Sequence, residues 1–191
     1  MTNIAILASG SGTNAQRISE YFANHPLIRV SLILSNNPDA FVLSRAGNLG
    51  IPSHVFSRKT FYETNEIPQL LIKHDITFIV LAGFLWLIPS SLLGMYPGRI
   101  INIHPALLPK YGGKGMYGVK IHKAVTDAGE RESGISIHYV NEKYDEGDII
   151  FQARCPVRPD DTPESLAGRI HKLEYRYYPE VIEKVVTGLA V

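Results

Sequence analysis

Short apolar runs alternate with longer amphipathic segments over the first half of the chain. The helix-compatible segments span residues 13–22, 40–49 and 59–73. Strands of the buried type are predicted over residues 4–8, 30–34, 77–81 and 99–103, with a weaker one over 52–56. Strands and helices that alternate in this way favour a parallel sheet with helices on both faces.

The pattern changes in the second half of the chain. Residues 134–140 alternate like a half-exposed strand, and the polar turn 141–148 leads to a second strand over 149–157. We expect these two strands to pair antiparallel. A long helix should follow, with Thr162 as its cap and Pro163 at its first position. Its apolar stripe is expected to contain Leu166, Ile170, Leu173, Tyr177, Val181 and Val185.

The composition fits a single globular domain over residues 1–191. Hydrophobic residues make up 45% of the chain and charged residues 19%, so disorder is not expected. The net charge is +1 with the two signs interspersed, which argues against a nucleic-acid surface because that would need a clustered basic face.

Cysteine usage and the apolar segments favour a cytoplasmic protein. Cys155 is the only cysteine, and its apolar flanks favour an inert core thiol. No basic segment precedes the first apolar run, so no signal peptide is expected. The apolar stretch 78–93 contains Gly83 and Pro89 and is too short to cross a bilayer.

The first candidate site is the glycine turn 10–15, which lies between the first strand and the first helix. Free amides at a helix start favour an anion, and the spacing G-x-G-x-x-A is a form of the dinucleotide fingerprint. The acidic residue that this fingerprint requires further on is replaced by Ser35 and Asn36. A phosphate site with Thr13 and Asn14 as extra donors is therefore favoured over NAD; a tight turn without a ligand is an equal alternative.

The second candidate site is the pair Asn102 and His104. Strand alternation places both side chains on one side, at the end of a buried strand where open α/β sheets bind ligands. Together they could donate hydrogen bonds to an oxyanion. The alternative is a hydrogen-bonded polar pair that only closes the strand, which is the commoner situation for an isolated Asn-x-His.

The third candidate site is Asp145, in the polar turn 144–148. Carboxylates and glycine are ordinary in hairpin turns, and His138 on the preceding strand needs no role beyond a hydrogen bond. If Asp145 lies near His104, its charge would raise the pKa of the imidazole and orient the ring. The glycine-rich loop 110–118 is either a lid over the strand ends or a flexible surface loop.

Taken together, these segments resemble the folate-dependent formyltransferases, a family with a Rossmann-like α/β fold. The most specific match is the run Asn-Ile-His-Pro-Ala-Leu-Leu-Pro at residues 102–109. With the glycine turn, it is most similar to the members of the family that formylate glycinamide ribonucleotide rather than methionyl-tRNA. The resemblance covers nearly the whole chain through residues 6–14, 80–84, 102–109, 145–147 and 174–179.

The resemblance implies an enzyme of purine biosynthesis that transfers the formyl group of 10-formyltetrahydrofolate to the amine of glycinamide ribonucleotide. Asn102 and His104 would stabilise the oxyanion, and Asp145 would keep His104 protonated. Because the folate is a co-substrate, no metal or redox cofactor is implied. The partners would be these small molecules, without nucleic acid or membrane, and the protein would be a monomer or homodimer.

The resemblance also implies the binding residues. Gly12, Thr13 and Asn14 would hold the substrate phosphate, and Glu174 would bind the ribose. Trp86 stands where an arginine is expected, so a charge near the folate tail is lost. The implied folate-binding residues are Arg58, Leu85, Trp86, Leu87, Ile88, Asn141 and Glu142.

Three alternatives to the formyltransferase remain. A formyltetrahydrofolate hydrolase uses a similar Asn, His and Asp set and releases formate. A nucleotide-binding Rossmann module is disfavoured by Ser35 and Asn36. A non-catalytic folate binder would leave Asn102, His104 and Asp145 without a purpose.

Overall fold

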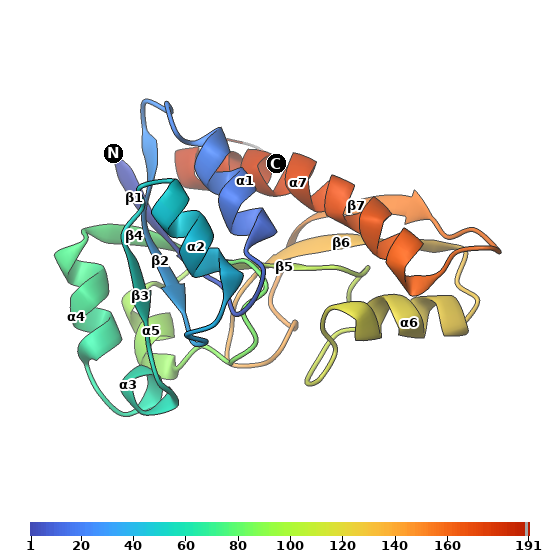
Figure 1. Cartoon of the computed structure of the whole chain (residues 1–191), viewed down its shortest axis with the longest axis horizontal. Helices are drawn as coiled ribbons and strands as arrows, with labels where there is room; N and C mark the ends of the chain where they lie inside the picture. The colour runs from blue at the N-terminus through green and yellow to red at the C-terminus, as the bar shows by residue number, and fades with distance from the viewer. Residues whose placement is uncertain (190) are drawn as a thin grey trace. The chain divides into compact units, whose positions relative to one another are not determined.

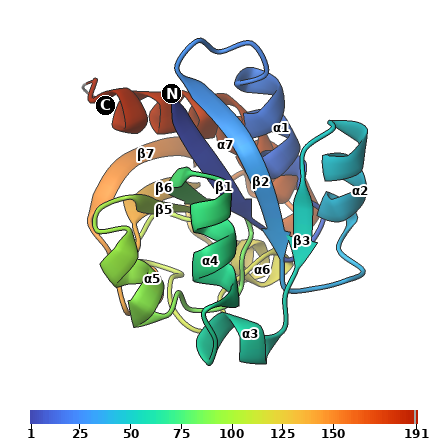
Figure 2. The same ribbon diagram turned by 90° about the vertical axis from the view of Figure 1, so that its left-hand side faces the viewer.

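The computed structural model describes residues 1–189 and 191, and the chain falls into two compact units, Met1–Ile101 and Asn102–Val191. Each unit is an α/β arrangement of its own elements (Figures 1 and 2). Strand β5 (Ile100–His104) begins in the first unit and ends in the second.

The first unit is built on a parallel sheet. Its other strands are β1 (Thr2–Leu7), β2 (Ile28–Ser35), β3 (Ser53–Val55) and β4 (Ile76–Leu81), and the strand order is β3-β2-β1-β4-β5. β1 pairs in parallel with β2 and β4, and β2 with β3. β1, β2 and β4 are largely buried, as expected from their nearly continuous apolar runs.

Helices cover both faces of this sheet, which confirms the predicted architecture. Figure 2 shows α1 and α2 on one side of β1 and β2, and α4 and α5 on the other. The helices are α1 (Thr13–Tyr21), α2 (Phe41–Asn48), α3 (Arg58–Tyr62), α4 (Glu66–Lys73) and α5 (Ser90–Met95).

The single helix predicted over residues 59–73 is wrong, because the segment divides into α3 and α4. The Thr64 hydroxyl accepts a hydrogen bond from the Glu66 amide at the start of α4. Pro68 follows in the first turn of α4, where its missing N–H costs least. These residues therefore start a new helix.

The second unit contains the end of β5, with β6 (Glu132–Tyr139) and β7 (Ile149–Pro156) in the order β5-β6-β7. β6 and β7 pair antiparallel, as predicted, and Ser136 lies opposite Gln152. Cys155 on β7 is buried, and burial raises the pKa of its thiol, which fits an inert core residue.

Two helices complete the second unit, α6 (Val119–Asp127) and α7 (Pro163–Thr187). Thr162 caps α7, with Pro163 at its first position, as expected. The predicted stripe on α7 was only partly right: Leu173, Tyr177 and Val185 are half-buried. Steps of four residues from Leu166 instead lead along the buried face through Ile170, Glu174, Tyr178 and Ile182. No helix within residues 1–189 is long and apolar enough to cross a membrane.

Candidate active site

The glycine turn after β1 is fixed by close packing in the first unit. Gly12 has φ 73°, in the left-handed region that favours glycine. A Cβ atom on Gly12 would collide with the Val42 side chain and would lie 2.8 Å from the Val42 Cα. The Val42 amide donates to the Gly10 carbonyl over 3.1 Å, which joins the turn to α2. The backbone can adopt this turn only with glycine at position 12.

The start of α1 presents its backbone amides next to the turn. Gly12 is the N-cap and supplies no side-chain acceptor to these amides. Thr13 and Asn14 are half-buried in the first helical turn. The positive end of the helix dipole and the amides together favour an anion here.

Arg45 on α2 adds a positive charge beside the turn, and the sequence patterns did not single it out. Its Nε donates to the Ser11 carbonyl over 2.8 Å, and its Nη1 bonds to the Gln16 Oε1. Its guanidinium also lies over the Phe41 ring, 4.9 Å from the ring centroid. These contacts hold a cation where the turn meets α1.

An aromatic cluster follows β4 in the first unit and includes Trp86. The Arg58 guanidinium lies over the rings of Tyr62 and Trp86, 5.0 and 5.7 Å from their centroids. Tyr62 and Trp86 are stacked with an interplanar angle of 29°. The structure therefore brings together two of the predicted folate residues, Arg58 and Trp86, and holds the cation on aromatic faces.

Segment 85–88 is held to its neighbours at both ends. The Leu85 amide donates to the Ser9 hydroxyl over 3.2 Å, and the Tyr62 hydroxyl donates to the Leu87 carbonyl over 2.8 Å. Leu85 is exposed, whereas Ile88 is buried. The Ile88 side chain therefore belongs to the core, and only the backbone of Ile88 is available to contact a ligand.

In the second unit, Asn102, His104 and Asp145 lie in one polar network at the end of β5. His104 is buried, with its Nδ1 3.4 Å from the Asp145 Oδ2. The Asn102 Nδ2 lies 3.5 Å from the Asp145 Oδ1. The condition that the sequence could not test, proximity of Asp145 to His104, is met.

His138 is the fourth member of this network, and its part was missed. The Asn102 Nδ2 donates to the His138 Nε2 over 3.1 Å, and the Nδ1–H of His138 donates to the Tyr139 carbonyl over 2.8 Å. The His138 Nε2 also lies 3.6 Å from the Asp145 Oδ1. His138 thus links the strand residue Asn102 to the turn residue Asp145.

The strand predicted over residues 134–140 is present as β6, but the prediction that one of its faces is exposed is wrong. Ser136 and His138 occupy the polar positions of the alternation, and both are buried. The Ser136 hydroxyl donates to the Ala106 carbonyl over 2.7 Å and accepts from the Leu108 amide and the Gln152 Nε2. A polar residue in an alternating strand is expected to face water, but here the polar face contacts the segment after β5.

The glycine-rich loop contacts the network through its backbone. The Nε2–H of His104 donates to the Tyr111 carbonyl over 2.8 Å, and the Gly113 amide donates to the Asp145 Oδ2 over 3.0 Å. Tyr111 and Asp145 have φ of 58° and 57°, unusual for residues with side chains. The loop therefore covers the donor that His104 could offer to a substrate.

Burial dominates the electrostatics of His104. Burial lowers the pKa of the imidazole below its ordinary value, and the Asp145 charge and the Tyr111 carbonyl offset this only in part. The Asp145 charge therefore raises the pKa of His104, as expected, but burial outweighs it. For the Asp145 carboxyl, burial alone would raise the pKa, but the nearby His138, His104 and Gly113 amide together lower it.

The remaining predicted residues of the second unit lie on α7 and in the loop after β6. Glu174 is buried on α7. Asn141 and Glu142 are exposed, and the Asn141 Oδ1 accepts from the Lys143 amide over 2.9 Å. Across residues 1–189 and 191, no group of three or more His, Cys, Asp or Glu side chains is arranged to hold a metal ion.

Comparison with known proteins places this geometry in a family. A profile described as formyl transferase matches residues 2–182. A chloroplastic phosphoribosylglycinamide formyltransferase of Arabidopsis thaliana is 42% identical over 94% of this chain, and this chain spans 63% of that relative. The phosphoribosylglycinamide formyltransferase of Haemophilus influenzae is 37% identical over 98% of this chain and 89% of its own length.

Solved structures give the same result for the fold. The crystal structure of phosphoribosylglycinamide formyltransferase from Streptococcus pneumoniae TIGR4 superposes with a TM-score of 0.85 and 38% identity. The match covers 97% of this chain and 99% of that one. Since the profile matches nearly the whole chain and the relatives align over more than nine tenths of it, the chain belongs to the formyl transferase family.

Proposed function

We propose that this protein transfers the formyl group of 10-formyltetrahydrofolate to the amine of glycinamide ribonucleotide. The products are formylglycinamide ribonucleotide and tetrahydrofolate. The observation that carries the proposal is the buried network of Asn102, His104, Asp145 and His138, in a chain whose relatives are named phosphoribosylglycinamide formyltransferases. Residues 1–191 act as one catalytic domain, in the cytoplasm.

The network supplies hydrogen bonds to the oxyanion that forms when the amine attacks the formyl carbon. The Nε2–H of His104 is one donor, and in the free protein it is bonded to the Tyr111 carbonyl. Asn102 is the other: its 3.5 Å contact with Asp145 is long for a hydrogen bond, so this N–H is the one offered to substrate. Preorganised donors of this kind are worth several kcal/mol in acyl transfer.

The loop must move for His104 to reach the substrate. Tyr111 lies in the left-handed region, which is unfavourable for a tyrosine, so release of its carbonyl relieves a local strain. Glycines at 113, 115 and 118 also have positive φ and can absorb the change. Loop 110–118 acts as a lid that exchanges its own carbonyl for the oxyanion.

Asp145 balances charge and protons. Its lowered pKa keeps the carboxylate ionised at neutral pH, 3.4 Å from the His104 Nδ1. The charge of this carboxylate raises the pKa of the imidazole against the effect of burial, and it therefore stabilises the protonated form of His104 that donates to the oxyanion. The attacking amine must lose a proton, and the folate N10 must gain one as the C–N bond breaks. Asp145 assists this transfer through water.

The substrate phosphate binds at the start of α1, where Gly12, Thr13 and Asn14 present amides and polar side chains beside Arg45. Glu174 accepts hydrogen bonds from the ribose hydroxyls. Because the donor is a co-substrate, the proposal requires no metal. The protein is a monomer or homodimer, and it binds neither nucleic acid nor membrane.

The folate is bound by residues of the first unit through backbone and charge. The pterin ring lies against the backbone of Leu85, Trp86, Leu87 and Ile88, and Arg58 binds a carboxylate of the tail. Stacking on Tyr62 and Trp86 orients the Arg58 guanidinium before the ligand arrives. In the second unit, Asn141 and Glu142 supply further polar contacts to the pterin.

Purified protein with both substrates tests the proposal. We expect tetrahydrofolate and formylglycinamide ribonucleotide to form in equal amounts, and neither to form without the ribonucleotide. Absorbance of the folate and mass spectrometry of the ribonucleotide measure the two products. Release of free formate independent of the ribonucleotide would instead favour a formyltetrahydrofolate hydrolase.

A further inference from the structure

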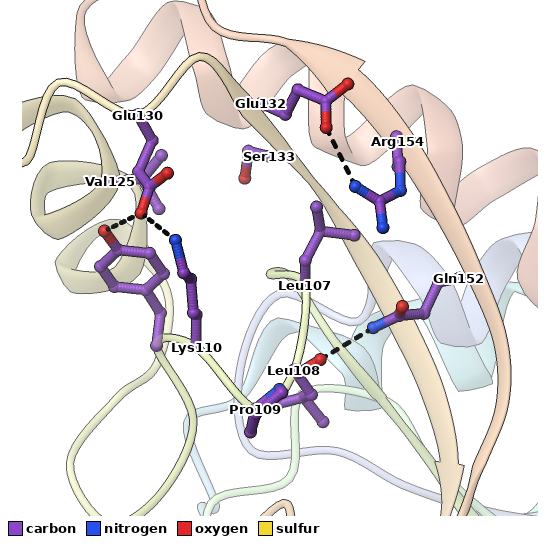
Figure 3. Close-up of a pocket in the computed structure, with 11 residues that line it drawn as sticks. Leu107, Leu108, Pro109, Lys110, Val125, Glu130, Glu132, Ser133, Gln152 and Arg154 are labelled. Atoms are coloured by element: carbon purple, nitrogen blue, oxygen red, sulfur yellow. Dashed lines mark hydrogen bonds and ion pairs between the residues drawn. The ribbon is translucent and has the colours of Figure 1, made fainter.

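A pocket lies in the second unit (Figure 3), and none of Asn102, His104, His138 and Asp145 lines it. Its volume is about 280 Å³, near the lower end for small-molecule sites. One wall is segment 107–111, which follows β5, and the opposite wall comes from β6 and β7. The catalytic proposal assigns no ligand to this pocket.

Two ion pairs border the pocket on opposite sides (Figure 3). On one side, the Glu130 Oε1 binds the Lys110 Nζ at 2.8 Å and accepts from the Tyr111 hydroxyl over 3.0 Å. On the other, the Arg154 Nη1 lies 2.9 Å from the Glu132 Oε2. The two positive and two negative side chains balance. The electrostatic potential of the pocket therefore favours neither a simple anion nor a simple cation.

Ser133 on β6 is the observation that points to a ligand. Its side chain is buried, with 2% exposure, yet its hydroxyl has no hydrogen-bond partner among residues 1–189 and 191. Figure 3 shows the hydroxyl directed into the space between the two ion pairs. A buried hydroxyl without a partner is unfavourable, and a ligand acceptor at this position would satisfy it.

The rest of the lining is apolar except for Gln152, whose Nε2 already donates to the Leu108 carbonyl and the Ser136 hydroxyl. Leu107, Leu108 and Val125 contribute side chains to it, and Leu107 packs against Gly134, where a Cβ atom would lie 2.7 Å from the Leu107 Cδ2. The pocket thus combines an apolar surface, a free hydroxyl and charges of both signs. These features match a small molecule that has an apolar body and two opposite charges.

We infer that this pocket binds a small zwitterion, namely a free α-amino acid with a branched or aromatic side chain. Its carboxylate accepts hydrogen bonds from the Ser133 hydroxyl and the Arg154 guanidinium, and its ammonium group donates to Glu130. Its apolar side chain covers Leu107 and Leu108. The balanced ion pairs favour such a ligand over a simple anion or cation.

Segment 107–113 connects this pocket to the catalytic network. The Leu108 Cδ2 is 2.6 Å from the position that a Cβ on Gly112 would take, and that position is 3.3 Å from the Asp145 Cβ. Tyr111, whose hydroxyl borders the pocket, holds His104 through its carbonyl. An occupied pocket therefore restrains the lid and slows formyl transfer; this regulatory step rests on the proposed function, whereas the binding step does not.

Binding is tested on the whole protein by calorimetry and by ¹H–¹⁵N spectra. The probes are L-leucine and L-phenylalanine, compared with 4-methylpentanoate, which lacks the ammonium group, and 3-methylbutylamine, which lacks the carboxylate. We expect saturable, millimolar binding of the amino acids, with amide shifts confined to segment 107–113, to Val125 and Glu130, and to the pocket residues of β6 and β7. Each truncated probe should bind about tenfold more weakly.

Ser133→Ala tests the assignment of the hydroxyl. The variant removes an unpaired buried group, so it should fold at least as stably as the parent, and its affinity for leucine should fall by about fivefold to tenfold. The matched control is Ser19→Ala, a buried serine on α1 that does not line the pocket. Its affinity for leucine should equal that of the parent.

Three results would overturn the inference. Absence of saturable binding, or shifts outside the pocket, would remove the site. Equal affinity for leucine and 4-methylpentanoate would show that the ammonium group is not recognised and that the ligand need not be a zwitterion. An unchanged rate of formyl transfer at saturating leucine would show that the pocket does not act on His104. If the protein binds leucine but does not transfer a formyl group, the proposed function and its regulation are wrong, and the binding site stands.

Discussion

The ends of β1 and β5 offer two different kinds of site. β1 ends in a turn whose chemistry lies in the backbone, held by the φ of Gly12 and its contact with Val42. β5 ends in a network of side chains from β5, β6 and the following loop, held by hydrogen bonds and charge. The first site depends on shape, and the second on ionisation.

This difference predicts which substitutions each site tolerates. A backbone site should keep its turn when a side-chain charge is removed but should not accept an added methyl group. A buried polar network should accept substitutions of equal size and lose its activity when a charge is removed. The four predictions below test this distinction, starting with the largest expected effect.

Asp145→Asn should lower kcat by about a thousandfold, because it removes the carboxylate that balances the charge on His104. Asparagine tolerates the left-handed backbone at this position, where φ is 57°, so the fold should persist. Steady-state kinetics should show a KM for the ribonucleotide within about threefold of the parent. The control is Glu146→Gln in the same turn, an exposed residue paired with Lys143, which should retain full activity.

Loss of stability without loss of kcat in the folded Asp145→Asn protein would show that the turn is only structural. The distinction between a charge-dependent and a shape-dependent site would then fail.

Gly12→Ala should lower the free energy of unfolding by about 2–4 kcal/mol, because it combines a strained backbone with overpacking. The new Cβ would lie 2.8 Å from the Val42 Cα, a backbone atom that cannot turn away. The KM for the ribonucleotide should also rise. Gly10→Ala is the control, because a Cβ at Gly10 meets nothing within 4 Å. Denaturant unfolding that shows equal losses for the two variants would contradict this account of the turn.

His138→Gln should lower kcat by about tenfold to a hundredfold, less than Asp145→Asn. Glutamine can still accept a hydrogen bond from Asn102, but the variant loses the imidazole that helps to lower the pKa of the Asp145 carboxyl. The pH profile of kcat separates this positioning role from a purely structural one: the profile should shift in the variant. An unshifted profile with a uniformly lower rate would mean that His138 serves packing alone.

Acid should destabilise the second unit through His122 on α6. Burial, and to a smaller extent His171 and His104, lower the pKa of the His122 imidazole to about 4. Because this folded-state pKa lies below the unfolded value near 6.5, the contribution to stability is complete above pH 6.5 and is lost as the pH falls toward 4. The loss should be roughly 3 kcal/mol by pH 4.

His122→Phe should flatten this pH dependence, which thermal or urea unfolding between pH 7 and 4 would measure. The Nδ1 of His122 has no hydrogen-bond partner in residues 1–189 and 191, so its removal breaks no hydrogen bond at that atom. An identical slope in the parent and the variant would show that the acid sensitivity arises elsewhere.

Much of the fold followed from local pattern. The parallel strands β1, β2 and β4 were evident as continuous apolar runs, and the cap of α7 from Thr162 and Pro163. Alternation failed on β6, because Ser136 and His138 are polar yet buried against their own hydrogen-bond partners. Periodicity reports the polarity of a side chain, whereas burial depends on what packs against it.

The candidate site divides in the same way. The glycine turn after β1 and the Asn-x-His at the end of β5 were evident from residue types and spacing, because backbone conformation and strand alternation are local properties. Only the tertiary structure could bring Asp145 to His104 and His138 to Asn102, cover His104 with the Tyr111 carbonyl, and set the direction of the pKa of His104. Desolvation and charge act through space, between residues far apart in the chain, and local sequence patterns carry no record of those distances.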